Sequence, residues 1–165
     1  CGHEIKYIDI DIPPTSTVAE YYLSKLFGEK RVATFLGTSD SEFIDINRLP
    51  IISVLCSWQI EKIVGKIDLF VNFISFQEME PYVVENYLKH VNRLEANWIL
   101  LRNLREGKQK RTKDSVGVQE PVLADDYIRM LPNYDLVDRS VHPFGYRTVD
   151  GYNSELLLFR RNADS

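Results

Sequence analysis

The fold is decided by the stretch Ile67–Met79, which reads Ile-Asp-Leu-Phe-Val-Asn-Phe-Ile-Ser-Phe-Gln-Glu-Met. Its apolar part is too short to cross a membrane, and a polar cluster follows it. This is typical of a buried parallel strand that carries polar groups to the carboxyl edge of an α/β sheet, where ligands bind. The stretch therefore predicts ligand-facing side chains at Asn72, Ser75, Gln77 and Glu78. The alternative is a core strand followed by a helix cap, in which Ser75, Gln77 and Glu78 only satisfy backbone groups.

Strand and helix patterns alternate on both sides of this stretch. The strands are expected at residues 5–12, 32–36, 51–55, 67–74, 98–101, 136–141 and 155–159. The helices are expected at residues 17–27, 58–64, 80–95 and 125–131, the first with the spacing of a capping box at Thr17 and Glu20 and a stop at Gly28. The alternation predicts a Rossmann-like, doubly wound α/β sheet in one domain, mostly parallel with an antiparallel final strand and without its first strand and helix.

The composition excludes several classes of protein. A net charge of −4 gives no indication of nucleic-acid binding. Two cysteines cannot make a disulfide framework, and no apolar run approaches the roughly 20 residues of a membrane span, so we expect a cytoplasmic protein. The sequence contains no P-loop, no Gly-x-Gly-x-x-Gly, no nucleophile elbow and no ligand spacing typical of a metal site.

Two further strand ends supply candidate binding residues. Asp9 and Asp11 share a face of the first strand, and an acid at such a strand end accepts hydrogen bonds from both ribose hydroxyls of a nucleotide. Asp11 is nearer the edge; its alternative role is to cap the following helix. Arg102 and Asn103 end a later strand and open a basic loop, which either attracts a phosphate- or carboxylate-bearing substrate or is an ordinary solvated surface.

Two residues are candidates for a catalytic base. Glu78 can take a proton from a hydroxyl if burial favours its protonated form, although an acid just before the helix that Pro81 opens is equally suited to capping. His142 follows the strand at residues 136–141 and titrates near neutrality, although a lone histidine in a turn is more often structural.

Several of these segments resemble the sugar O-methyltransferases, which are Rossmann-like, S-adenosylmethionine-dependent enzymes of bacterial polysaccharide gene neighbourhoods. The matching segments are Asp11-Ile12-Pro13-Pro14, Tyr21-Tyr22-Leu23, Asp68–Met79, Asn86-Tyr87-Leu88 and Leu100–Asn103. The most distinctive of them is the string Ser-Phe-Gln-Glu-Met at Ser75–Met79. The resemblance extends to about residue 107 and is weaker beyond it.

The resemblance implies that Asp11 binds the ribose of S-adenosylmethionine and that Asn72–Glu78 lies beside the methyl donor, with Ser75 among the cofactor-binding residues. It also implies an upstream strand and a Gly-rich loop, which this sequence lacks. That strand would lie between those at residues 5–12 and 67–74, so we expect altered strand pairing or a homodimer formed through the exposed edges. We also expect that the chain by itself can be inactive.

The favoured hypothesis is therefore methyl transfer from S-adenosylmethionine to a hydroxyl of a sugar or glycan. Glu78 and His142 are the candidate bases, while Gln77, Arg102 and Asn103 are the candidate substrate-binding residues. A noncatalytic or degenerate α/β interaction module is the alternative, and an NAD-dependent Rossmann enzyme is a third.

Overall fold

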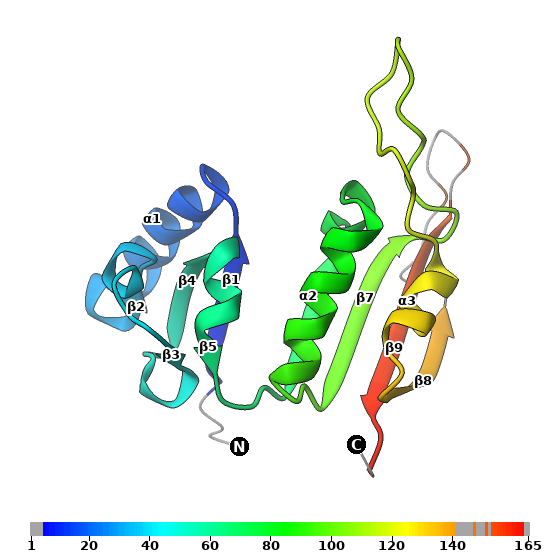
Figure 1. Cartoon of the computed structure of the whole chain (residues 1–165). Helices are drawn as coiled ribbons and strands as arrows, with labels where there is room; N and C mark the ends of the chain where they lie inside the picture. The colour runs from blue at the N-terminus through cyan, green and yellow to red at the C-terminus, as the bar shows by residue number, and fades with distance from the viewer. Residues whose placement is uncertain (1–4, 141–146, 148–150, 152, 164–165) are drawn as a thin grey trace. The chain divides into compact units, whose positions relative to one another are not determined.

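The computed structural model describes residues 5–140, 147, 151 and 153–163 of the chain. The chain divides into two compact units, Cys1–Lys66 and Ile67–Ser165, called unit 1 and unit 2 here (Figure 1). Each unit is described by itself.

Unit 1 is an α/β unit built on a small parallel sheet. Its strands are β1 (Tyr7–Asp11), β2 (Val32–Ala33), β3 (Ile44–Asp45), β4 (Ile52–Cys56) and β5 (Ile63–Val64). Its one α-helix in the described residues is α1 (Thr15–Phe27), and its 3-10 helices are η1 (Glu29–Arg31), η2 (Leu36–Thr38), η3 (Ile46–Arg48) and η4 (Ser57–Lys62). The strand order is β1-β4-β2, and β3 pairs with β5; all of these pairs are parallel.

The centre of unit 1 is β4, which was expected only as a short extra strand. Every residue of β4 is buried, and the strand pairs with β1 on one side and β2 on the other. Val32, Ile52 and Val54 form one core cluster of the unit, and Leu23 of α1 packs against it. A strand that is buried on both faces lies in the interior of a sheet, as β4 does. The sequence of β4 only weakly indicates this burial, because two of its five residues have small polar side chains.

Unit 2 contains a mixed sheet with the strand order β6-β7-β9-β8. Its strands are β6 (Leu69–Phe73), β7 (Trp98–Leu104), β8 (Tyr134–Ser140) and β9 (Ser154–Arg161). Its helices are η5 (Ser75–Glu78), α2 (Pro81–Arg93) and α3 (Ala124–Met130). β6 runs parallel to β7, whereas β9 lies antiparallel to both β7 and β8, which confirms the antiparallel final strand.

The two α-helices of unit 2 lie on the same face of this sheet (Figure 1). The core between them and the sheet includes Val84 and Leu88 of α2, Tyr127 of α3, and Leu101 and Phe159 of the sheet. On the other face, the outward side chains of β6 stay exposed: Leu69 is 52%, Val71 46% and Phe73 47% exposed. The expectation of a buried strand is therefore wrong for one face of β6: successive side chains point to opposite faces, and only one of these faces packs into the core.

Several element boundaries differ from the sequence prediction. The helix expected from Thr17 begins at Thr15, with Pro14 at its N-cap and no side-chain cap, so the predicted capping box is wrong. The helix expected at residues 58–64 is the 3-10 helix η4, followed by β5. Arg102 and Asn103, expected at a strand end and loop start, lie within β7, which continues to Leu104.

The fold is thus α/β, with parallel sheets and one mixed sheet. β1 and β6 lie in different sheets rather than in one continuous doubly wound sheet. In the described residues, each of these two strands has one paired neighbour, β4 for β1 and β7 for β6. None of the helices in the described part of the chain is long and apolar enough to span a membrane.

Candidate functional site

The carboxyl end of β6 is closed by a turn that Asn72 holds. The Asn72 side chain accepts a hydrogen bond from the Phe76 backbone N–H through Oδ1 at 3.2 Å. Its Nδ2 donates to the Ser75 hydroxyl at 2.6 Å. Because β6 and β7 are parallel, this turn lies at the same sheet edge as the end of β7. The structure therefore brings Asn72 and Ser75 together at the carboxyl edge of this sheet, and their cofactor-binding role stays a prediction.

Gln77 and Asn103 join this turn to β7. The Asn103 side chain accepts from the Gln77 backbone N–H at 3.2 Å and donates to Asn72 Oδ1 at 3.5 Å. In return, Gln77 Oε1 accepts from the Leu104 N–H at 2.9 Å. Gln77 and Asn103 are only 7% and 4% exposed. These contacts satisfy buried backbone groups, as the capping alternative requires, and the substrate-binding role of both residues stays a prediction.

Glu78 lies at the exposed side of the same turn. Its side chain is 47% exposed, and Oε1 accepts hydrogen bonds from Lys108 Nζ at 2.8 Å and from Gln77 Nε2 at 3.3 Å. The burial on which its role as a base depended is absent. In the described residues both of its hydrogen bonds are on Oε1, and Oε2 makes none. Its role as a base stays a prediction.

Ile74 has a strained backbone at the centre of this turn. Its φ of 73° lies in the left-handed region, which is a genuine outlier for a β-branched residue. The conformation lets its N–H donate to the Arg102 carbonyl at 2.8 Å, so the chain leaves the strand and turns at once into η5. Strain of this kind persists where surrounding contacts over-determine the backbone, and it concentrates at functional sites.

We expect Ile74→Gly to be more stable than Ile74→Ala by about 1 kcal/mol, because both lose the same apolar side chain but only glycine tolerates this φ without strain. The comparison is made by urea unfolding of the two variants. As a control, alanine should be at least as stable as glycine at Val116, which is 87% exposed and has no positive φ. If alanine is also the more stable residue at position 74, the backbone there is not left-handed in solution.

Asp11 is the last residue of β1 in unit 1. Its Oδ1 accepts from the Ile12 N–H at 2.7 Å, which leaves the second carboxylate oxygen for another donor. Burial, followed by the neighbouring charge of Asp11, raises the pKa of Asp9. This supports the expectation that the two carboxylates share a face. Since Asp11 belongs to unit 1, its role beside Asn72 and Ser75 stays a prediction.

The two remaining candidates have different outcomes. Arg102 donates through Nε to the Ser154 hydroxyl at 3.2 Å, so it ties β7 to β9. His142, the second candidate base, lies outside the described residues.

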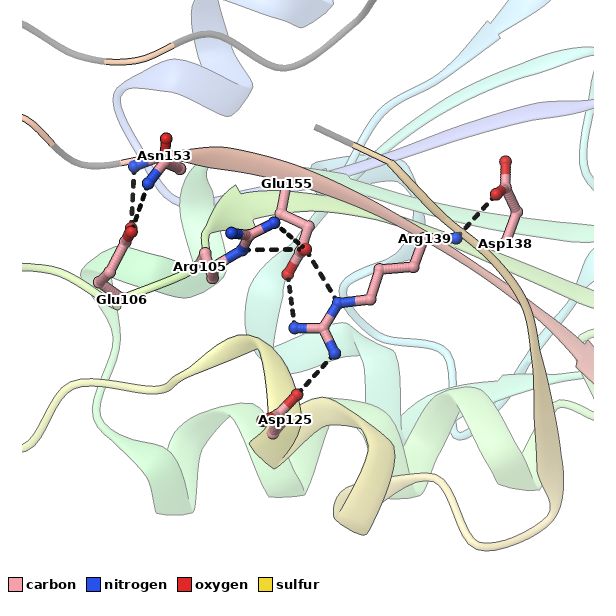
Figure 2. Close-up of polar contacts among 7 residues, drawn as sticks. All are labelled: Arg105, Glu106, Asp125, Asp138, Arg139, Asn153 and Glu155. Atoms are coloured by element: carbon pink, nitrogen blue, oxygen red, sulfur yellow. Dashed lines mark hydrogen bonds and ion pairs between the residues drawn. The ribbon is translucent and has the colours of Figure 1, made fainter. Parts of the chain in front are cut away.

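Sequence reasoning missed a buried carboxylate at this edge of the sheet, Glu155. Its side chain is 1% exposed and binds two guanidinium groups, as Figure 2 shows. Arg105 donates to Oε1 at 3.1 and 3.0 Å, while Arg139 donates to Oε1 at 2.9 Å and to Oε2 at 3.0 Å. Hydrogen bonds to Glu155 raise the pKa of Arg139, whose third contact is Asp125 at 2.8 Å.

This cluster adjoins the turn, because Glu155 pairs with Asn103 in the register of β7 and β9. The signal in the sequence was one acid opening an otherwise apolar strand. Such an acid is expected to have a cationic partner when it is buried.

Together these residues form a polar strand edge with apolar neighbours. Exposed Ser75 offers a hydroxyl beside the exposed side chains of Phe73 and Ile74. Taken by itself, this edge of unit 2 offers apolar surface and a hydroxyl, which are compatible with an adenosine group. In unit 1, Asp11 keeps one carboxylate oxygen that is able to accept a hydrogen bond from a hydroxyl group.

Comparison with known proteins gives distant structural likenesses. No protein-family model matches the chain, and no curated protein matches it. Among solved structures it is similar to a variant of LepI in complex with SAH and a substrate analogue, with a TM-score of 0.45 and 8% identity over 96% of this chain and 43% of that chain. LepI in complex with SAM gives a TM-score of 0.43 at 8% identity, over 96% of this chain and 43% of that chain. A structure described as a pericyclic reaction enzyme gives 0.43 at 8% identity, over 96% and 44%. The chain spans less than half the length of these solved chains.

Proposed function

We propose that this chain is part of an S-adenosylmethionine-dependent O-methyltransferase that acts on a sugar hydroxyl in bacterial polysaccharide or glycan biosynthesis. One observation carries the proposal: the distinctive string Ser75–Met79 lies at the carboxyl end of a parallel strand, in one hydrogen-bonded network with the end of the next strand. This edge is where open α/β sheets bind nucleotide-like ligands.

The roles of the residues follow from their free atoms. Asp11 would bind the ribose hydroxyls through the carboxylate oxygen that the Ile12 N–H does not use. Ser75 and Asn72 would line the cofactor side of the turn, and Gln77 and Asn103 hold that turn in place. When bound, the cofactor supplies an electrophilic methyl group.

A proton must leave the acceptor hydroxyl during transfer, and the candidates are Glu78 and His142. Glu78 Oε2 is able to accept it, because the bonds from Lys108 and Gln77 are made to Oε1 and hold the carboxylate in position. Arg102, in the neighbouring strand, is a candidate for binding the sugar.

The cofactor part of the proposal is tested by calorimetry with S-adenosylhomocysteine. We expect binding that Asp11→Asn weakens about tenfold, since a carboxylate that accepts hydrogen bonds from ribose hydroxyls is lost. Asp40→Asn, which removes an exposed carboxylate of the same unit, should leave the affinity unchanged. The absence of any binding would favour the noncatalytic interaction module, and displacement by NAD would favour the dinucleotide enzyme.

A further inference from the structure

Between β7 and α3 the chain forms a projecting hairpin, residues 108–118, called the basic hairpin here. Figure 1 shows this segment, in yellow-green, extending beyond the end of β7. It carries the cations Lys108, Lys110, Arg111 and Lys113 and the single acid Asp114, within a chain whose net charge is −4. The local charge is therefore opposite in sign to that of the protein as a whole.

The basic hairpin is a loop closed by backbone contacts, among them an isolated parallel bridge between Lys110 and Val118. Arg111 N–H donates to the Val118 carbonyl at 2.7 Å, and Val118 N–H donates to the Gln109 carbonyl at 3.2 Å. Gln109 Nε2 donates to the Val116 carbonyl at 2.8 Å. Gly117 permits this close pairing, because a Cβ there would lie 2.2 Å from the Gln109 carbonyl oxygen. A preformed element loses less conformational entropy when it binds a ligand.

Both legs of the basic hairpin are attached to the candidate site. On the first leg, Lys108 forms an ion pair with Glu78 at 2.8 Å. After the second leg, the Gln119 and Glu120 N–H groups donate to the Glu80 carboxylate at 2.8 and 3.0 Å. Glu78 and Glu80 directly follow the turn that Asn72 and Gln77 hold. The hairpin therefore rises from the sheet edge at which the proposed reaction takes place.

Three cations of the hairpin have no partner in the described part of the chain. Lys110, Arg111 and Lys113 are exposed, and none of them makes an ion pair or a side-chain hydrogen bond with a described residue. Glu78 and Glu80, at the base, are already bonded to Lys108 and to backbone N–H groups. The single acid of the hairpin, Asp114, offsets only part of this charge.

We propose that the acceptor sugar carries a phosphate or carboxylate group and that Lys110, Arg111 and Lys113 bind it. This inference rests on the proposed function, since it names the substrate class of the same site. Arginine and lysine bind phosphate and carboxylate oxygens through charge-assisted hydrogen bonds. Three cations suit one small anionic group, whereas a nucleic acid would require a longer basic track.

The test is an NMR titration of the full chain with isotope-labelled amides. The probes are glucuronate, a phosphate monoester of glucose, glucose itself and inorganic phosphate. We expect both anionic sugars, but not glucose, to shift the amide signals of residues 108–118. Replacing Lys110, Arg111 and Lys113 by glutamine should weaken this binding about tenfold, as expected for three exposed contacts. The two anionic probes distinguish a carboxylate from a phosphate.

Two variants separate a built site from general charge attraction. Replacing Lys30, Arg31 and Lys89 by glutamine removes the same charge from exposed positions elsewhere and should leave binding unchanged. Gly117→Val keeps every charge but displaces the paired backbone, so it should weaken binding of the anionic sugars. Equal weakening in the control triple variant, or full binding by Gly117→Val, would overturn the proposal.

The remaining outcomes are equally decisive. If inorganic phosphate binds as tightly as the sugar phosphate, the hairpin holds an adventitious ion only and the acceptor class is wrong. Titration with S-adenosylhomocysteine on the same variants separates the two proposals. Cofactor binding without binding of anionic sugars would refute the acceptor class alone. Anionic-sugar binding at the hairpin without cofactor binding would refute the methyltransferase.

Discussion

Replacing Phe76 by alanine is expected to lower the free energy of unfolding by about 4 kcal/mol, as large-to-small changes of buried aromatic residues do. Phe76 is 1% exposed and lies at the centre of an aromatic cluster beneath the turn. Its ring lies 6.0 Å from that of Phe70, 5.9 Å from Tyr87 and 6.3 Å from Tyr127, centroid to centroid. Truncation leaves a cavity that these rings cannot fill, because α2, α3 and the sheet fix their positions.

Urea unfolding measures this loss, and Phe76→Leu is the matched control. Leucine retains most of the apolar volume, so we expect that variant to lose about 1 kcal/mol. If alanine costs no more than leucine, Phe76 does not pack in the core as the structure has it. Because Phe76 lies within the Ser75–Met79 string, the same pair of variants also shows how far the shape of the turn depends on the packing below it.

Replacing Glu155 by glutamine is expected to lower the free energy of unfolding by about 3 kcal/mol, since removing one member of a buried ion pair leaves charges uncompensated. The carboxylate accepts four hydrogen bonds from Arg105 and Arg139. Glutamine keeps the shape but turns one acceptor oxygen into a donor group facing a guanidinium. The value lies at the lower end of the usual range, because the arginine side chains are 43% and 37% exposed and water can partly solvate them.

The matched control for this prediction is Asp125→Asn. Asp125 binds the same Arg139, but its side chain is 66% exposed. Exposed ion pairs contribute less than about 1 kcal/mol, so this variant should unfold almost like the parent protein. Equal losses from the two variants in chemical denaturation would contradict the different burial of the two carboxylates.

The fold was predictable from sequence where one face of an element is buried. The apolar run of β6 and the helical spacing of Val84, Leu88 and Val91 in α2 indicated both elements correctly, although β6 is exposed on one face. The central place of β4 was not predictable, since strand order depends on pairings between segments distant in the chain. The start of α1 was predicted two residues too late. The spacing of Thr17 and Glu20 is that of a capping box, but the helix begins after the turn at Pro14, and the residue spacing does not distinguish these two starts.

The candidate site was predictable to the extent that its residues are local. Asn72 and Ser75 were expected close together because they are three residues apart, and their side chains are hydrogen-bonded. Their ligand-binding role stays a prediction. The contact between Gln77 and Asn103 depends on the register of β6 and β7, which periodicity does not define. The cluster around Glu155 joins four segments of the chain, so only the presence of an acid in an apolar strand indicated it.

In the basic hairpin, one set of groups determines the backbone shape and another set carries the charge. Backbone pairing, Gln109 and Gly117 set its geometry, and the side chains of Lys110, Arg111 and Lys113 take no part in its hydrogen bonds with other described residues. Substitutions at these three positions should therefore alter the charge of the hairpin with little effect on folding, as is usual for exposed residues. The three cationic positions can therefore change in sequence without loss of the fold. Selection can alter which acidic group the hairpin binds, one residue at a time, while the sheet edge beneath it stays the same.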